Sequence, residues 1–176
     1  SKNIKVFICD LEKTGAPICL VKDILRAGYQ INHLVNNARS REGLNVKDDG
    51  TTDRETFLSE YLMHVIVPYE IAMALIKLQD RNCKTITNIG SMYGLVAANP
   101  NLYSDHLRQS PIQYGIAKAA LHHLTKELAV RFAKYEIRVN CIAYGGVEGR
   151  VDEAFKARYA KLNPTGRMLN VQEVVG

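Results

Sequence analysis

A tyrosine and a lysine four positions apart are the residues of this sequence best suited to moving a proton. Tyr114 and Lys118 lie in SPIQYGIAKAALHHLTKELA, whose apolar spacing predicts a helix, and residues four apart share one helical face. A free phenol ionises only at about pH 10 and is a poor base at neutral pH. A lysine ammonium about 4 Å away contributes on the order of 4 kcal/mol at an effective dielectric of about 20, enough to bring proton transfer near neutral pH. The spacing is also common by chance, so an ordinary exposed helix face is the competing interpretation.

Polar residues that follow two strand-like runs strengthen the chemical interpretation. Ser91 comes directly after KTITNIG (84–90), and Asn36 and Asn37 close the run HLVNNA (33–38). The carboxyl ends of parallel strands meet at the sheet edge where ligands bind. A serine there can orient a substrate oxygen, although serine also caps helices and asparagine also forms turns after strands.

The elements that must position these residues alternate along the chain. Strands are predicted at 4–9, 33–38, 84–90 and 138–144, and helices at 16–27, 53–78, 112–134 and 151–162. The strands lack polar alternation, which is typical of strands buried on both faces. Pro68 should kink or interrupt the second helix. This order predicts one α/β domain over residues 1–176, a Rossmann-like doubly wound parallel sheet, with loops at 39–53 and 97–110.

Composition favours an ordinary globular protein. The 176 residues are 47% hydrophobic and 23% charged, and no apolar run approaches the roughly 20 residues of a membrane-spanning helix. The net charge of +5 is spread along the chain, so we expect neither a nucleic-acid nor a membrane partner. The four cysteines form no CxxC pair and we assign no metal site, so a reduced, cytoplasmic protein is expected.

The order of these motifs resembles the short-chain dehydrogenase/reductase family. Asp10-Leu11, Asn36-Asn37-Ala38, Ser91, Tyr114-x-x-x-Lys118 and RVNCIAYGGV (138–147) follow one another as they do in that family, and the resemblance covers essentially the whole chain. It implies an NAD(P)-dependent oxidoreductase that interconverts an alcohol and a carbonyl, with NAD or NADP as cofactor. The alternative is a non-catalytic, family-like binding or regulatory protein.

The resemblance also implies a role for each matching residue. Tyr114 would be the general acid/base, Lys118 would make its phenol more acidic and hold the nicotinamide ribose, and Ser91 would orient the substrate oxygen. Residues implied to contact the cofactor are Asp10, Leu11, Asn36, Ala38, Tyr114, Lys118, Gly145 and Val147.

Some segments of the family pattern are missing here. The glycine-rich turn T-G-x-x-x-G-x-G that cradles a pyrophosphate does not occur, nor does the strand whose end selects NAD or NADP. The four predicted strands would correspond to family strands 3, 4, 5 and 6, which leaves the run at 4–9 without a ladder partner. We therefore expect a fragment that binds NAD(P) poorly and is inactive alone.

Single positions depart from the pattern as well. Arg39 replaces the glycine of Asn-Asn-Ala-Gly, His64 stands where a catalytic Asn is usual, and Val67 replaces a glycine three residues later. A lone helical histidine is usually structural. His64 is also a catalytic candidate, because it could hold a water that relays protons from Lys118.

The spacing between Ser91 and Tyr114, 114 − 91 = 23 positions, is longer than in the commonest family members. The additional polar residues, about 99–110, would form a wall over the substrate. This long form is most similar to family enzymes of surface-polysaccharide and flagellin-glycan biosynthesis, which implies a sugar or sugar-nucleotide substrate. The resemblance further implies a homodimer or homotetramer, with the helix predicted at 112–134 in the interface.

Overall fold

A three-stranded parallel sheet forms the centre of the computed structural model, which describes residues 4–40, 42–79, 82–149 and 151–174. The strands are β1 (His33–Asn36), β2 (Thr85–Ile89) and β3 (Arg138–Ile142), in the order β1-β2-β3. Leu34 pairs with Ile86, which pairs with Val139. The predicted α/β class with a parallel sheet is confirmed.

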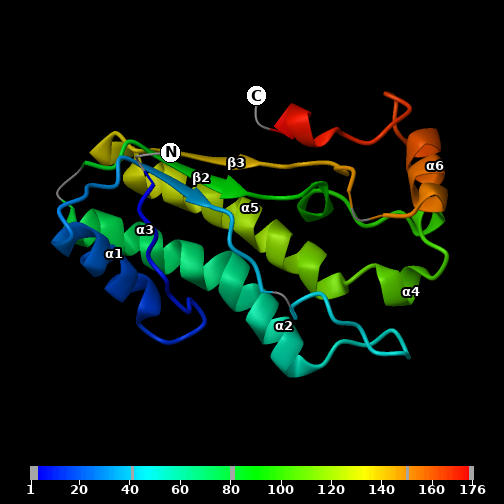
Figure 1. The fold of residues 1–176 in the computed structure, drawn as a ribbon, viewed down its shortest axis with the longest axis horizontal. Helices are drawn as coiled ribbons and strands as arrows, with labels where there is room; N and C mark the ends of the chain where they lie inside the picture. Colours follow the sequence, from blue (N-terminus) through cyan, green and yellow to red (C-terminus); the bar gives the residue numbers. More distant parts are fainter. Residues whose placement is uncertain (1–3, 41, 80–81, 150, 175–176) are drawn as a thin grey trace.

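The helices connect the strands in sequence. They are α1 (Ala16–Arg26), α2 (Arg54–Tyr61), the π-helical turn η1 (Leu62–Ile66), α3 (Val67–Leu78), α4 (His106–Gln109), α5 (Ile112–Phe132) and α6 (Glu153–Leu162), with short 3₁₀ turns η2 (Met92–Gly94), η3 (Pro100–Leu102), η4 (Ala133–Tyr135) and η5 (Val171–Val174). Right-handed crossovers between strands in sequence order place the connecting helices on one face. Figure 1 shows α1, α3 and α5 on the same side of the sheet, with α6 at the far end from α1.

The strands are buried on one face, not on both as predicted. Ile86 and Val139 are buried beneath the helices, whereas Val35 and Ile142 are 60% and 40% exposed. The other face is exposed because, within the described residues, the connecting helices cover only one face of the sheet (Figure 1). Apolar strands without polar alternation therefore leave hydrophobic side chains on the other face.

The strand predicted at 4–9 is wrong for this structure. The segment is extended but belongs to no ladder, and Ile4, Val6 and Ile8 are largely exposed, Ile8 to 97%. A β-strand needs a neighbour to satisfy its backbone groups, and none of the described strands lies beside this segment. Its apolar side chains favour a strand only where such a neighbour exists.

The long helix predicted at 53–78 changes its winding before Pro68. The N–H of Val67 bonds to the carbonyl of Leu62, a π-type step that separates α2 from α3. Proline has no N–H and its ring crowds the carbonyl four residues earlier, here that of His64, so a wider turn relieves the conflict. The interruption was predicted; its form as a π turn was not.

This continuous helix, Arg54–Leu78, is long and apolar enough to span a membrane by length and composition alone. Half of its most apolar part is buried inside the protein. Val67, Ala72 and Leu75 belong to the main hydrophobic cluster between the helices and the sheet. The packing therefore accounts for its apolar character as that of a core helix.

The main core lies between the sheet and helices α1, α3 and α5. Its buried members are Val21, Met63, Val67, Ile71, Ala72, Ala74, Leu75, Cys83, Ile86, Leu128, Phe132, Ile137 and Val139. A second, smaller cluster joins Leu102, Tyr159 and Met168 at the α6 end. The main core fixes α3 and α5 on the sheet. Helix α5 carries Tyr114 and Lys118, and α3 directly follows the π turn η1, which carries His64.

Candidate active site

Lys118 is buried at the carboxyl end of β2. Lys118 is only 5% exposed, and its Nζ donates to the carbonyl oxygen of Ile89 at 2.6 Å. Nζ also lies 3.2 Å from Nδ1 of His64 and 5.7 Å from the centroid of the Tyr114 ring. Burial lowers the pKa of Lys118 to about 8, while the nearby charge of Glu60 acts in the opposite direction.

Tyr114 lies half-buried on the same face of α5, one turn before Lys118. Its ring meets the edge of the His64 ring, with centroids 6.1 Å apart and planes at 80°. Within the described residues its hydroxyl makes no hydrogen bond, which leaves it available to a substrate oxygen. The prediction that Tyr114 and Lys118 share one face of a helix is confirmed, and the structure adds that the His64 ring contacts both.

The first turn of α5 is anchored by Gln113, which is fully buried. Its amide donates to the carbonyl oxygens of Gly43 and Asn45 at 2.9 and 3.1 Å, and accepts from the hydroxyl of Thr52 at 2.9 Å. The loop after β1 is therefore tied to the residue next to Tyr114. The sequence reasoning missed Gln113, because a glutamine on a helix carries no signal of burial.

Ser91 is brought to α5 by the short turn η2. Its Oγ accepts from the N–H of Tyr93 at 3.2 Å, so it caps η2 as its alternative interpretation predicted. The turn packs tightly on α5: a Cβ on Gly94 would lie 2.7 Å from the carbonyl carbon of Lys118. His122 Nε2 lies 3.1 Å from the carbonyl oxygen of Ser91. Ser91 thus lies against the Tyr114/Lys118 segment, and its hydroxyl can still donate.

Asn36 takes part in a hydrogen-bond line across the carboxyl edge of the sheet. Its Nδ2 donates to Oδ1 of Asn88 at 2.8 Å, and Asn88 Nδ2 donates to Oγ1 of Thr125 at 2.9 Å. Thr125 in turn donates to the carbonyl of Leu121 at 2.8 Å. Asn88 is completely buried, and neither it nor Thr125 was singled out from the sequence. The line holds Asn36 in place at the edge where the cofactor prediction puts it.

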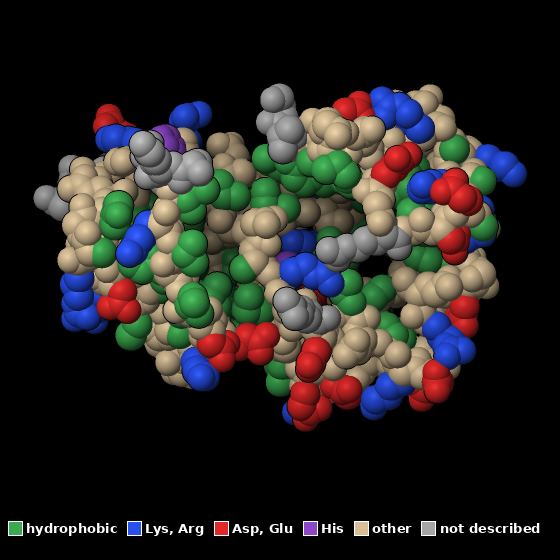
Figure 2. Space-filling model, viewed as in Figure 1, with side chains coloured by type: hydrophobic (Ala, Val, Ile, Leu, Met, Phe, Trp, Pro, Cys, Tyr) green, Lys and Arg blue, Asp and Glu red, His purple; other side chains and the backbone are tan. Residues whose placement is uncertain are grey.

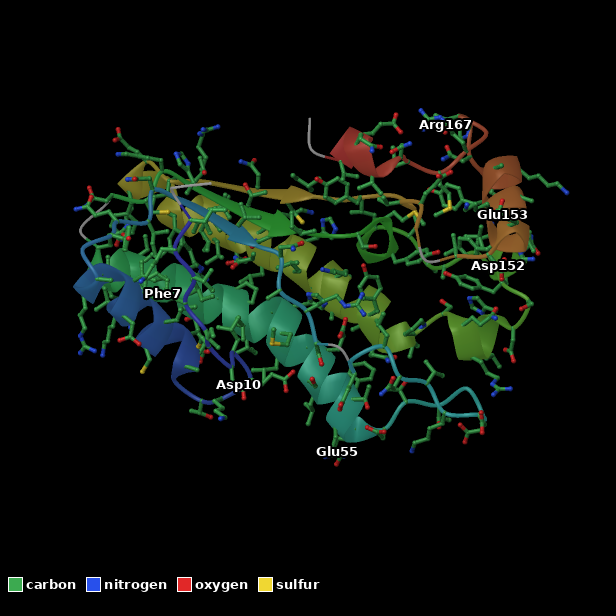
Figure 3. The ribbon with its side chains drawn as sticks, in the orientation of Figure 1. Phe7, Asp10, Glu55, Asp152, Glu153 and Arg167 are labelled. Carbon is green, nitrogen blue, oxygen red and sulfur yellow. The ribbon has the colours of Figure 1, made fainter. Side chains whose placement is uncertain are left out.

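The remaining predicted cofactor residues divide between two ends of the molecule. Asp10 is exposed, forms a 3.6 Å ion pair with Lys13, and lies well away from α6 (Figure 3). Leu11 packs against the main core, and Ala38 is exposed just after β1.

Gly145 and Val147 follow β3, at the α6 end. A Cβ on Gly145 would lie 3.1 Å from the hydroxyl of Tyr159, and Val147 forms a parallel bridge with Leu169. Their roles toward a cofactor stay predictions.

The segment predicted as a polar wall connects two parts of the site. Leu102 is buried against Tyr159 and Met168, and the hydroxyls of Tyr93 and Tyr103 lie 2.6 Å apart. The segment is not all loop, since it contains η3 and α4.

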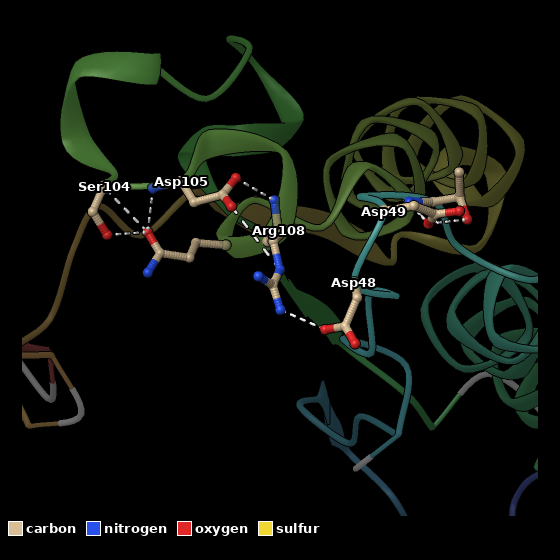
Figure 4. A network of polar contacts seen from close by, with 7 residues as sticks. Asp48, Asp49, Ser104, Asp105 and Arg108 are labelled. Carbon is tan, nitrogen blue, oxygen red and sulfur yellow. Dashed lines mark hydrogen bonds and ion pairs between the residues drawn. The ribbon is translucent and has the colours of Figure 1, made fainter.

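On its other side, Arg108 of α4 bridges Asp105 and Asp48, and so joins the wall to the loop after β1 (Figure 4). The segment therefore spans from α6 to the loop that contacts Gln113.

Charge is mixed over the surface. On the described part of the face in Figure 2, Lys and Arg side chains lie among Asp and Glu side chains around the rim. Hydrophobic side chains form separate patches between them, among tan backbone and other uncharged groups.

The family model described as Enoyl-(Acyl carrier protein) reductase, one of the short-chain dehydrogenase/reductase models, matches residues 1–176. The chain belongs to the short-chain dehydrogenase/reductase family. Flagellin modification was named in the sequence resemblance, and the chain is 31% identical over 91 residues to "Post-translational flagellin modification protein A" of Campylobacter coli, covering 52% of this chain and 36% of that protein. It is 30% identical over 152 residues to the NADH-dependent L-xylulose reductase of Ambrosiozyma monospora, covering 82% and 53%.

Solved structures of the family share the fold. A short-chain dehydrogenase from Leptospira borgpetersenii with bound NAD+ superposes with a TM-score of 0.81 at 26% identity, over 95% of this chain and 63% of that one. The chain thus spans about a third to two thirds of the length of these family members. Within that span lie the end of β2 and helix α5, where the sequence predicts Ser91, Tyr114 and Lys118 as site residues.

The described residues fit the nicotinamide-ribose half of a dinucleotide. Two of the three N–H groups of Lys118 point to Ile89 and His64, and the third has no partner among the described residues, so it matches a ribose hydroxyl. Asn36 ends β1, Ala38 follows it, and Gly145 and Val147 follow β3, at the carboxyl edge where such sheets take their ligands.

Proposed function

We propose that the protein containing this chain is an NAD(P)-dependent oxidoreductase that interconverts an alcohol and a carbonyl on a sugar or related polyhydroxylated substrate. The single observation that carries the proposal is the buried Lys118 ammonium beside Tyr114, whose hydroxyl has no partner within the described residues. A protein that only binds does not need a buried cation next to a free phenol. The family to which the chain belongs supports the same reaction class.

In this proposal Tyr114 exchanges the proton and Ser91 orients the reacting oxygen. In the direction of reduction, the Tyr114 hydroxyl donates its proton to the carbonyl oxygen, which becomes the alcohol. The Ser91 hydroxyl donates a hydrogen bond to the same oxygen and holds it in line. Lys118 stabilises the phenolate that Tyr114 becomes, and the reverse reaction returns the proton to it.

Asn36, Ala38, Lys118, Gly145 and Val147 would hold the nicotinamide cofactor at the carboxyl edge. When bound, the cofactor supplies or accepts the hydride, which is the difficult part of the chemistry. The protein's contribution is placement of the reacting carbon and exchange of the proton.

Two observations support a sugar-like substrate. The segment 99–110, largely polar, joins α6 to the loop after β1, and its Tyr103 contacts Tyr93 in the turn that follows Ser91. One relative's name, L-xylulose reductase, is that of a sugar-reducing enzyme. Polar groups on a wall match the several hydroxyls of such a substrate better than an acyl chain.

The test uses the whole gene product that contains this chain. NAD(P)H oxidation is followed with a panel of ketoses and polyols, and Tyr114→Phe is compared with the unchanged protein. We expect kcat to fall by about 10²–10⁴-fold with NAD(P)H binding, measured by fluorescence, retained. Unchanged turnover in Tyr114→Phe contradicts the assignment. Binding without turnover for any substrate of the panel favours the regulatory alternative.

We also propose that the protein assembles as a homodimer or homotetramer through α5. Ile112, Ile116 and Val130 on this helix are 63%, 44% and 80% exposed. Light scattering of the unchanged protein should show an oligomer, and Val130→Lys should shift it towards a monomer. A monomer before substitution contradicts the proposal.

A further inference from the structure

Glu60 is a buried carboxylate for which neither the motif nor the proposed reaction has a use. It lies on α2, two residues before the π turn begins, and is 1% exposed. Gly43 of the loop after β1 covers it, and a Cβ there would lie 1.9 Å from Oε2. Burying a carboxylate is costly unless a partner offsets the loss of hydration. The Glu60 carboxylate therefore depends on its buried neighbours to offset this cost.

His64 connects this carboxylate to Lys118. Its Nε2 lies 2.9 Å from Oε1 of Glu60, and its Nδ1 lies 3.2 Å from Nζ of Lys118. The contact with Glu60 is at ion-pair distance but outside linear hydrogen-bond geometry, so the carboxylate acts on the ring chiefly through its charge. All three side chains are buried, where charge acts strongly.

The chemistry of the three groups selects one form of the imidazole. A lysine ammonium has donors only, so for as long as Lys118 is charged it favours the form of His64 whose facing nitrogen, Nδ1, is unprotonated. A neutral imidazole then carries its hydrogen on Nε2, the nitrogen that faces Glu60. The negative charge of Glu60 favours that arrangement, because it attracts the Nε2–H.

We propose that Glu60 is a positioning residue, which holds His64 as the tautomer whose Nδ1 accepts from Lys118 and so gives Lys118 a direct protein partner for its proton. The π turn before Pro68 contributes by bringing His64 inward, where Met63 and Val65 are buried with it. Transfer from Nζ to Nδ1 leaves a neutral amine and an imidazolium, and the Glu60 carboxylate balances the imidazolium charge. A water held by His64, as the sequence suggested, is not needed at this separation.

This inference rests on the proposed function for its kinetic consequences but not for its geometry. The charged and titratable described groups around the pair are Tyr114 on α5, Cys141 on β3 and Arg39 after β1. The charges of Glu60 and Cys141 favour the Lys118 ammonium, and that of Arg39 opposes it. Removal of the Glu60 charge should therefore make Lys118 lose its proton at lower pH.

The first experiment does not depend on activity. Long-range ¹H–¹⁵N spectra of the histidine rings, assigned with a His64→Gln variant, report the tautomer at neutral pH. We expect His64 of the unchanged protein to show the Nε2–H pattern, and Glu60→Gln to give a mixture with Nδ1–H. An Nδ1–H pattern in the unchanged protein, or an identical pattern in Glu60→Gln, overturns the inference.

Glu55→Gln is the matched control, because Glu55 is an exposed carboxylate on the same helix. It removes the same charge and should leave the His64 spectrum as it is in the unchanged protein. Should Glu60→Gln fail to fold, Glu60→Ala, which also removes the charge, serves in its place and should give the same mixture with Nδ1–H. Glu60→Asp, whose shorter side chain keeps the charge, is expected to preserve the Nε2–H pattern.

The second experiment measures kcat against pH. We expect Glu60→Gln to move the alkaline limb of the profile to lower pH. At pH 9 its kcat should fall by about tenfold with KM little changed. Glu60→Asp, which keeps the charge, should recover most of the lost kcat. A profile of Glu60→Gln that coincides with that of Glu55→Gln overturns the inference while the proposed function stands. If the unchanged protein shows no turnover, the proposed function fails, and the tautomer experiment alone decides on Glu60.

Discussion

The Lys118 ammonium donates to the carbonyl oxygen of Ile89, the last residue of β2, at 2.6 Å. This bond fixes the second turn of α5 to the carboxyl end of the central strand. It also keeps the ammonium buried beside Tyr114, at a cost in hydration that the protein bears whenever Lys118 is charged. The proposed function needs this cation, whereas stability alone favours an apolar side chain.

The stability of the protein should therefore depend on the charge of Lys118. Its pKa of about 8, below the ordinary 10.5, means that the unfolded chain binds more protons between these pH values. Stability contributed by this group is thus lowest below pH 8 and rises towards pH 10.5. Relative to Lys118→Met, the unchanged protein should gain on the order of 3 kcal/mol across that window, at about 1.4 kcal/mol per tenfold change in proton affinity.

Urea unfolding at several pH values from 7 to 10 measures this difference. Lys126→Met, at an exposed position of α5, is the control for loss of a lysine from the helix. A constant difference between the unchanged protein and Lys118→Met over that pH range shows that burial does not act on Lys118 as described.

Asn88→Ala should destabilise the protein strongly. It removes the group that links Asn36 to Thr125, and leaves both without this partner at a buried edge. We expect a loss of about 2–3 kcal/mol in the free energy of unfolding, measured in urea. Asn140→Ala, at an exposed position of β3, should change it by less than about 0.5 kcal/mol. Equal effects of the two substitutions would show that the line across the sheet contributes no stability.

Gly94→Ala should separate Ser91 from α5. A new Cβ would lie 2.5 Å from Cδ2 of His122 and close to the Lys118 backbone, so η2 must move away. We expect a loss of about 1–3 kcal/mol in stability and, in the active protein, a lower kcat, because Ser91 precedes this turn. Glycine-to-alanine changes at unstrained sites stabilise by reducing chain entropy, so a gain in stability would show that η2 is not packed as described.

Arg108→Ala should loosen the wall without unfolding the protein. The ion pairs of Arg108 with Asp48 and Asp105 are exposed, so their loss should cost less than about 1 kcal/mol. Hydrogen exchange should nevertheless quicken in 104–109 and in the loop at 47–51, which Arg108 joins. Arg131→Ala, which removes an exposed ion pair with Glu127 on α5, is the control. Faster exchange confined to 104–109 would contradict a tether between the two segments.

Local patterns predicted a large part of this fold. The apolar stripe and the four-residue spacing predicted α5 and the shared face of Tyr114 and Lys118, because helical periodicity depends on the chain itself. The three runs that became β1, β2 and β3 were recognised within two residues at either end. Pro68 predicted an interruption, since its missing N–H acts locally.

Errors and omissions arose where a partner distant in sequence decides the outcome. The run at 4–9 has the composition of a strand, but a ladder requires a neighbour, and no described strand lies beside it. The sequence pattern indicates a surface carboxylate at Glu60. It is buried because Gly43, 17 positions earlier in the chain, packs on it. The four-residue spacing of Glu60 and His64 was a weak signal in the sequence that the two side chains share a helical face.

The sequence by itself determined the family, most of the order of helices and strands, and the candidate residues for proton exchange, because these depend on residue type and spacing along the chain. Only the tertiary structure decided that Lys118 is buried against Ile89 and that His64 contacts it directly. It also decided that the Glu60 carboxylate lies 2.9 Å from Nε2 of His64. The physical reason is that burial and charge in a low-dielectric interior come from contacts between α2, β2 and α5, which no local pattern contains.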